Sequence, residues 1–185
     1  MTEHLISLLK KHGLKISTAE SCTGGLVASK ITSISGSSEI FQMGFVTYAE
    51  ESKMKFIDVK PQTLAEHSVY SKEVAIEMAI GCMNEAEADV GIGITGVAGA
   101  DPEIVLMDGC PVEIEPGTVY ISCALKRENY IKVVSQKFVR DPKKRIFEDF
   151  KDDFRNTIRE NAAEFAIEMA AELIEEEFNY VNESR

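Results

Sequence analysis

LKISTAESCTGG, the stretch at residues 14–25, places a strand directly before a glycine-rich turn and a helix. Residues 14–19 alternate between apolar and polar side chains, and this alternation predicts the strand. The following helix is predicted over residues 23–34, where the sequence SGSS then ends it. A strand that enters a helix through a tight turn is typical of α/β folds, whose ligand crevices lie at the carboxyl ends of the strands.

Helices and strands alternate through the rest of the chain. An N-cap at Thr2 and a closing Gly13 bound the first helix, and the pair Asp141-Pro142 is a suitable start for the last one. The other elements are expected as helices at residues 50–57 and 71–85 and as strands at residues 40–48, 89–95, 118–125 and 130–138. Two segments are expected to be irregular, a connection at residues 61–70 and a long loop at residues 100–116.

The last helix carries a single apolar stripe, because large apolar residues recur at three- or four-residue spacing between residues 147 and 173. The strands at residues 118–125 and 130–138 are joined by a tight hairpin, so the sheet is expected to be mixed. The whole pattern predicts a single domain over residues 1–185. Its fold class is α/β, a three-layer α/β/α sandwich with a mixed sheet of about five strands.

Composition limits the classes of function. The chain has 185 residues, of which 44% are hydrophobic, and this suits one domain with a substantial core. A net charge of -11 argues against a nucleic-acid partner, because phosphate backbones attract basic surfaces. The first residues are too polar for a signal peptide or a membrane span. The four cysteines lack zinc-site spacing, and free cysteines without an export signal predict a cytoplasmic protein with no metal site.

The chemistry is expected at Ser21, in the turn between the first strand and its helix. Unpaired backbone N–H groups at such a turn stabilise an anion or a developing oxyanion, and two glycines let a ligand approach the backbone. A serine at this point is therefore a candidate nucleophile. The same residues also fit a serine that only caps the helix, and the local pattern does not separate the two interpretations.

A nucleophilic serine needs a base. None of the three histidines, His4, His12 and His67, is placed for a Ser-His-Asp arrangement, so a lysine is the simpler candidate. Lys53 and Lys55 both follow a strand that ends at the same edge of the sheet. Either lysine acts as a base only if burial or a nearby cation lowers its pKa, and the alternative is that both are solvated helix residues.

The loop at residues 94–99 follows a third strand and is expected to meet the turns after Ala19 and Tyr48 on one rim.

The other charged groups have simpler interpretations. The glutamates at residues 175–177 are expected to be a solvated helix end, and the basic residues at 143–145 to be exposed charge. The acidic residues between 101 and 108 match no compact metal-binding loop.

The motifs TAESCTGG, GSS, GFVTYAEESK, ITGVAG and PGTVYI, in this order, closely resemble the CinA C-terminal family. That family includes stand-alone nicotinamide-nucleotide amidases, also called nicotinamide mononucleotide deamidases. The resemblance implies hydrolysis of the carboxamide of nicotinamide mononucleotide to nicotinic acid mononucleotide and ammonia, a step of pyridine nucleotide salvage. It also implies a serine–lysine mechanism, no cofactor, a small-molecule nucleotide substrate and a homodimer.

The resemblance assigns roles residue by residue. The family nucleophile falls on Ser21, its lysine on Lys53 rather than Lys55, and its supporting tyrosine on Tyr48. Ser38 and Thr95 match polar positions that line the site. The residues expected to bind substrate are Cys22, Thr23, Gly24, Ser38, Thr95, Gly96 and Arg140.

Two segments depart from the family pattern. A glycine-rich GPxGG segment is replaced by residues 98–103 and a more hydrophobic insertion through Val112. The usual G-D/N-R element before the last helix is replaced by residues 139–142, which leaves Arg140 or Arg145 to supply its arginine. Two alternatives therefore stay open. One is a catalytically silent nucleotide-binding or competence/damage-associated partner protein, and the other is an amidase with a shifted substrate.

Overall fold

A mixed five-stranded sheet forms the centre of the protein, as the sequence predicts. The computed structural model describes residues 1–107, 109–139 and 153–183. The strand order is β2 (Phe41–Val46), β1 (Ile16–Glu20), β3 (Val90–Gly96), β6 (Thr118–Lys126) and β7 (Ile131–Val139). The first three of these strands are parallel to one another, and β6 and β7 add in antiparallel orientation. The carboxyl ends of β1, β2 and β3 therefore meet at one edge.

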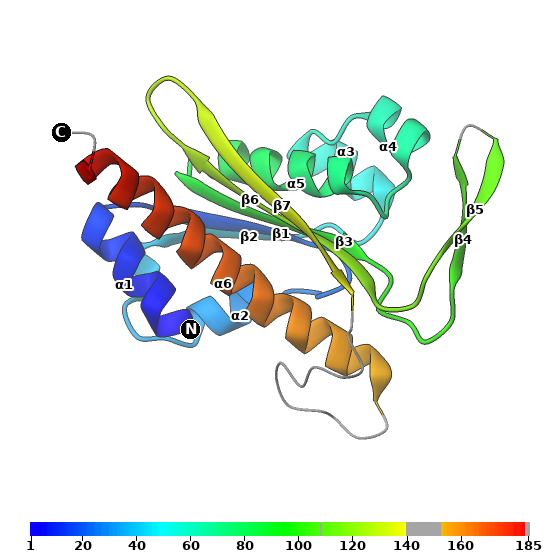
Figure 1. Ribbon diagram of the computed structural model, residues 1–185, viewed down its shortest axis with the longest axis horizontal. Coiled ribbons are helices and arrows are strands. Elements are labelled where there is room, and N and C mark those ends of the chain that lie inside the picture. The colour runs from blue at the N-terminus through cyan, green and yellow to red at the C-terminus, as the bar shows by residue number, and fades with distance from the viewer. Residues whose placement is uncertain (108, 140–152, 184–185) are drawn as a thin grey trace.

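Helices cover both faces of this sheet (Figure 1). One layer holds α1 (Thr2–His12), α2 (Leu26–Thr32) and α6 (Phe154–Glu183). The other layer holds α3 (Glu50–Ile57), α4 (Pro61–His67) and α5 (Lys72–Glu85), and a short 3₁₀ turn, η1 (Ser37–Glu39), precedes β2. The predicted three-layer α/β/α sandwich is confirmed. Among the described residues, no helix combines the length and the hydrophobicity needed to cross a lipid bilayer.

The close packing of α5 against β3 explains the glycines in the sequence DVGIGIT. Every residue of β3 is buried. A Cβ atom on Gly91 would lie 2.0 Å from the carbonyl oxygen of Ala79, and one on Gly93 would lie 2.2 Å from that of Ala75. Only glycine permits such an approach, so this helix fixes the strand that carries the loop at residues 96–99.

Two segments expected to be irregular are regular instead. Residues 61–67 form α4, because Pro61 is compatible with the first turn of a helix and Leu64 buries its side chain against the core. Within residues 100–116, β4 (Glu103–Met107) pairs with β5 (Cys110–Ile114) in an antiparallel hairpin separate from the main sheet. Its alternation is only five residues long on each side, so the sequence contains little periodic signal.

The ends of helices also differ from the predictions. Helix α2 starts at Leu26 rather than at residue 23, because Gly24 and Gly25 have φ angles of 63° and 95°. Thr2 is the first residue of α1, whose N-cap is Met1, while Gly13 closes that helix as predicted. The pair Asp141-Pro142 and the basic residues at 143–145 lie outside the described residues.

The expected solvated helix end is wrong for Glu177. This side chain is buried and accepts a hydrogen bond from the Tyr130 hydroxyl. Its carboxylate also lies 3.5 Å from Arg127 Nε and 3.4 Å from Lys132 Nζ. The three partners come from the β6–β7 hairpin, so Glu177 fastens the end of α6 to the sheet, far along the chain from the candidate site.

Candidate active site

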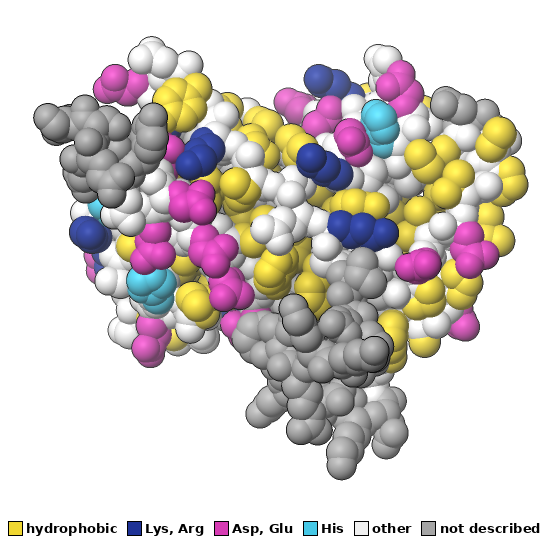
Figure 2. Space-filling view, in the orientation of Figure 1, with side chains coloured by type: hydrophobic (Ala, Val, Ile, Leu, Met, Phe, Trp, Pro, Cys, Tyr) yellow, Lys and Arg dark blue, Asp and Glu magenta, His cyan; other side chains and the backbone are white. Residues whose placement is uncertain are grey.

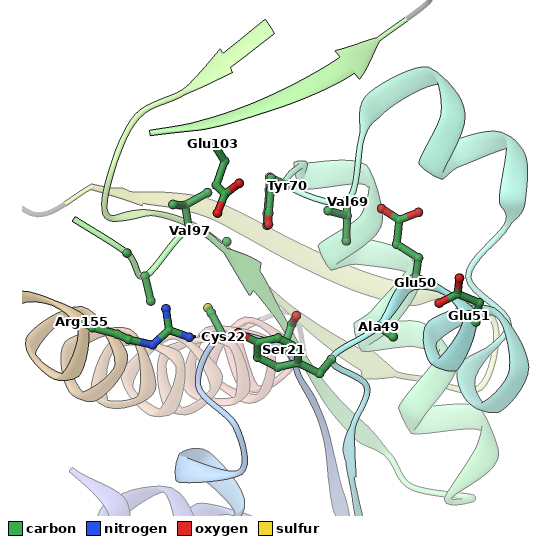
Figure 3. A pocket seen from close by; sticks show the side chains of 14 residues that line it. Ser21, Cys22, Ala49, Glu50, Glu51, Val69, Tyr70, Val97, Glu103 and Arg155 are labelled. Atoms are coloured by element: carbon green, nitrogen blue, oxygen red, sulfur yellow. Dashed lines mark hydrogen bonds between the residues drawn. The ribbon is translucent and has the colours of Figure 1, made fainter. Parts of the chain in front are cut away.

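Ser21 lies immediately after β1, at the edge where the parallel strands end. Its backbone N–H donates to the carbonyl oxygen of Ile94 at 3.0 Å, which ties the turn to β3. The residue is 7% exposed and lines a pocket of about 350 Å³. The turns after β1, β2 and β3 all contribute to this pocket, with Tyr70, Glu103 and Arg155 (Figure 3). The predicted meeting of three loops is thus what the structure contains.

Lys53, from α3, contacts the serine directly. Its side chain is 0% exposed, and Nζ donates to Ser21 Oγ at 3.1 Å. The same nitrogen donates to the carbonyl oxygens of Thr47 at 2.5 Å and Tyr48 at 3.2 Å. Lys55 is exposed, and its Nζ lies 5.1 Å from the centre of the Phe56 ring. Of the two candidate lysines, the structure places only Lys53 beside Ser21.

Burial changes the acidity of Lys53. Removal of the ammonium group from water lowers its pKa from 10.5 to about 8, and the nearby Glu50 and Cys22 oppose this change. A lysine with such a pKa is partly neutral near pH 7 to 8 and can then accept a proton. The geometry and the acidity of this lysine both suit a general base for Ser21.

The neighbouring thiol does not compete as a nucleophile. Cys22 is buried, and burial raises the pKa of its thiol to about 12. The thiolate is the reactive form of cysteine, so this side chain stays neutral and inert at ordinary pH. Cys82 and Cys123 are buried in the core.

The helix after the turn is capped by Glu20 and not by Ser21. The Glu20 carboxylate, which is fully buried, accepts hydrogen bonds from the backbone N–H groups of Gly25 at 3.0 Å and Val27 at 3.1 Å. It also accepts one from Ala28 at 2.9 Å. An anion at the N-terminus of α2 satisfies its unpaired donors. The hydroxyl of Ser21 therefore has no capping bond and faces Lys53.

Arg159 holds the turn from the side of α6. Its Nε donates to the carbonyl oxygen of Cys22 at 3.1 Å, and its Nη2 donates to that of Thr23 at 3.0 Å. The carbonyl and N–H of one trans peptide point in opposite directions, so the N–H of Thr23 is directed away from Arg159. The N–H of Thr23 makes no hydrogen bond within the part of the chain that the structure describes, and the N–H of Cys22 interacts there only with the thiol of its own residue. They are available to an oxyanion.

Arg155 is the arginine that lines the pocket, in place of the Arg140 or Arg145 that the sequence predicts. Arg155, in the first turn of α6, donates from Nη2 to the hydroxyl of Tyr48 at 2.9 Å. Arg140 and Arg145, the expected candidates, lie outside the described residues. The sequence signal for Arg155 and Arg159 was their four-residue spacing, which puts both on one face of the last helix.

Tyr48 contributes in two ways. The residue is 62% exposed and lines the pocket; its hydroxyl accepts the Arg155 bond, and its carbonyl oxygen accepts a bond from Lys53. The hydroxyl therefore pairs with the arginine, and only the backbone contacts the lysine.

The remaining predicted residues divide into two groups. Gly96 lines the pocket, and the buried Thr95 hydroxyl donates to the carbonyl oxygen of Val69 at 2.7 Å, which positions the segment that carries Tyr70. Thr23 and Gly24 belong to the turn itself. Ser38 is exposed in η1, at the opposite end of β2 from Ser21, and it does not line the pocket.

No metal-binding cluster of His, Cys, Asp or Glu occurs among the described residues.

Comparison with known proteins assigns this arrangement to a family. The sequence model of the CinA C-terminal domain matches residues 1–174. The chain belongs to the CinA C-terminal domain family. It is 44% identical over 127 residues to the nicotinamide-nucleotide amidohydrolase PncC of Escherichia coli K12, a match that covers 69% of this chain and 73% of that protein.

Other members of the family share parts of the sequence or the fold. A CinA-like protein of Chloroherpeton thalassium is 52% identical over 99 residues, which are 54% of this chain and 24% of that protein. The match to such CinA-like proteins thus spans about a quarter of their length. A crystal structure of a CinA superfamily protein from Klebsiella pneumoniae 700603 has a TM-score of 0.74 at 27% identity, over 95% of this chain and 96% of that one. A crystal structure of a CinA superfamily protein from Escherichia coli has a TM-score of 0.72 at 31% identity, over 94% of this chain and 87% of that one.

Proposed function

We propose that this protein hydrolyses the carboxamide of nicotinamide mononucleotide to nicotinic acid mononucleotide and ammonia. The observation that carries the proposal is the 3.1 Å contact between the buried Lys53 Nζ and the Oγ of Ser21, which lines a pocket. The similarity to a nicotinamide-nucleotide amidohydrolase supports the choice of reaction. The assigned roles are Ser21 as nucleophile and Lys53 as base.

The reaction runs through an acyl-enzyme. Neutral Lys53 accepts the hydroxyl proton as Ser21 Oγ attacks the carboxamide carbon, and the carbonyl oxygen becomes an oxyanion. The N–H groups of Cys22 and Thr23 stabilise this oxyanion. The lysine then gives its proton to the departing nitrogen, which leaves as ammonia. Water activated by the same lysine hydrolyses the ester and restores the serine. Each step uses only groups of the protein, the substrate and water.

Arg155 is the residue we assign to the substrate phosphate. Its Nη2 already donates to Tyr48, while the other guanidinium donors have no partner among the described residues. A guanidinium binds phosphate through parallel hydrogen bonds. Tyr48 then positions this arginine through its hydroxyl and the base through its carbonyl oxygen.

The test is ammonia release by the purified protein from nicotinamide mononucleotide. We expect turnover by the natural protein and loss of at least about 10³-fold in kcat for Ser21→Ala. Ordinary turnover by Ser21→Ala, or none by the natural protein, contradicts the proposal. A protein that binds the nucleotide, raises its own Tm and releases no product would instead be the catalytically silent alternative.

The phosphate assignment has its own measurement. Arg155→Gln is expected to raise KM for nicotinamide mononucleotide about tenfold, because a charge-assisted contact to the phosphate is lost. For nicotinamide riboside, which lacks the phosphate, the same substitution is expected to change KM less than twofold. Equal effects on both substrates would show that Arg155 does not read the phosphate. Preference for the riboside would favour an amidase with a shifted substrate, the alternative that the β4–β5 insertion supports.

We further propose that the protein is a homodimer in the cytoplasm. The support is the family resemblance and four free cysteines, which suit a reducing compartment. Light scattering during size-exclusion chromatography measures the mass of the oligomer. A dimer is expected to have a mass near 41 kDa, twice the 20.5 kDa of one chain. A single species near 20.5 kDa would contradict the dimer.

A further inference from the structure

The charges that line the active-site pocket are separated by sign. Arg155 lies on one side of Ser21 and Cys22, whereas Glu50 and Glu103 lie toward the other sides of the cavity (Figure 3). Glu51 adds a third carboxylate to the lining, beyond Glu50 in this view. The pocket therefore has a basic end and an acidic wall, which we define as Glu50 and Glu103.

The two carboxylates of the acidic wall lack a direct hydrogen-bond or ion-pair partner in the part of the chain that the structure describes. Glu50 and Glu103 make no side-chain hydrogen bond and no ion pair among the residues that the structure describes. Tyr70 also lines this pocket, and the pKa of its hydroxyl is raised first by burial and then by nearby charges, of which Glu103 is the largest and Glu50 a smaller one. The pocket lining thus holds two carboxylates with no direct partner among the described residues, together with the half-buried phenol of Tyr70.

The hairpin supplies the more informative of the two carboxylates. Glu103 is the first residue of β4, so it belongs to the insertion that distinguishes this sequence from the family pattern. The hairpin packs beside α4, and Val105 and Leu106 line a groove of about 570 Å³ together with Met54 and Leu64. This groove adjoins the active-site pocket at Glu50 and Val69. The hairpin is therefore placed to hold Glu103 over the cavity.

Unpaired like charges beside a substrate site favour a ligand of opposite charge. An anionic nucleotide alone would be repelled by the acidic wall, and a neutral amide would gain nothing from it. A ligand whose amide-bearing ring is cationic and whose other end is anionic matches both ends of this pocket. An N-substituted pyridinium with a phosphate has that charge distribution.

We propose that Glu103, assisted by Glu50, is a specificity-determining residue that selects substrates with a positive charge on the amide-bearing ring. The inference rests on the proposed function, because it concerns the ring that presents the carboxamide to Ser21. Glu103 contacts no reacting atom in this account. It acts on the affinity for the ring and leaves the serine–lysine chemistry unchanged.

The experiment measures binding in the Ser21→Ala variant, so that no turnover interferes. Calorimetric titration compares nicotinamide mononucleotide with benzamide riboside 5′-monophosphate, in which a neutral ring carries the same carboxamide, ribose and phosphate. Each ligand is titrated into three proteins: the Ser21→Ala variant, the double variant Ser21→Ala with Glu103→Gln, and the double variant Ser21→Ala with Glu113→Gln. Glu113 is the matched control, because it is exposed on β5 of the same hairpin and does not line the pocket.

We expect at least about tenfold preference for the pyridinium ligand in Ser21→Ala, since a nearby opposite charge stabilises the bound cation. Glu103→Gln is expected to reduce that preference about fivefold through weaker binding of the pyridinium alone. Glu113→Gln is expected to change the preference for the pyridinium ligand by less than twofold. The reduction should shrink as salt is raised, because Glu103 is exposed and its charge is screened.

Two results overturn the inference: an unchanged preference in Glu103→Gln, or equal weakening of both ligands. The proposed function is judged separately, by ammonia release from the natural protein. Charge-selective binding that depends on Glu103, without ammonia release, would contradict the amidase reaction and support the role of Glu103 in selectivity. Ammonia release with an unaltered ligand preference in Glu103→Gln would support the amidase reaction and contradict the role of Glu103.

Discussion

The turn at residues 20–25 and the hairpin at residues 103–114 both border the pocket, but they are built differently. The turn is fixed on several sides, by Glu20 through α2, by Arg159 from α6 and by Ile94 from β3. The hairpin is paired only with itself, and Ile104 and Leu106 are 70% and 68% exposed. Figure 2 shows hydrophobic side chains at the surface over the region of the hairpin. The groups proposed for the chemistry are held by the core, whereas the group proposed for selectivity is held by a hairpin outside the main sheet.

The largest expected loss of activity follows from removing the amine that contacts Ser21 in the turn at residues 20–25. Lys53→Met keeps most of the volume of the side chain and removes its amine, so Ser21 loses its base. We expect kcat for ammonia release to fall at least about 10³-fold. Lys55→Met, two residues away and exposed, is the control and should retain activity within twofold. Equal losses in the two variants would remove the distinction between the lysines.

A smaller effect is expected at the side of the turn. Arg159→Gln removes the paired hydrogen bonds to the carbonyl oxygens of Cys22 and Thr23, and the N–H groups are then free to reorient. We expect kcat to fall about 10- to 100-fold with KM changed less than threefold, which is below the effect of deleting an oxyanion donor outright. A rise in KM with unchanged kcat would assign Arg159 to substrate binding instead. Partial recovery of kcat in Arg159→Lys would support the positioning role.

The smallest effect is expected for the hairpin, when its contribution to stability is compared with that of the core strand β3. Ile92→Ala, in fully buried β3, is expected to lower the free energy of unfolding by about 2–5 kcal/mol. Ile104→Ala, on the exposed hairpin, is expected to change it by less than about 0.5 kcal/mol. Chemical denaturation followed by circular dichroism measures both. A large loss of stability in Ile104→Ala would mean that the hairpin is part of the cooperative core.

The same division decides what the sequence could predict. The strand, turn and helix around Ser21 follow from local periodicity and from glycines, so their positions were predicted within a few residues. The resemblance to the family then selected Lys53 over Lys55, which periodicity alone could not do. In the structure Lys53, and not Lys55, lies beside the serine, while the catalytic role of Lys53 stays a prediction.

The missed features depend on contacts between distant residues. Arg155 meets Tyr48 across 107 positions and Arg159 meets Cys22 across 137, and no local pattern encodes such pairs. Glu20 stands in the motif, but its capping of α2 depends on how the turn folds back. Pro102 directly precedes the hairpin, and Gly109 and Pro111 lie within it, so the sequence pattern of its two short strands resembles that of a loop.

The pH dependence of kcat/KM for nicotinamide mononucleotide tests most directly whether a buried lysine activates Ser21. The base must be neutral, and burial lowers the pKa of Lys53 to about 8. Activity should therefore be low at pH 6, rise with pH and reach a plateau above an apparent pKa of about 8. A profile that is flat from pH 6 to 9, or one whose rise is centred near the histidine value of about 6.5, would contradict the serine–lysine account.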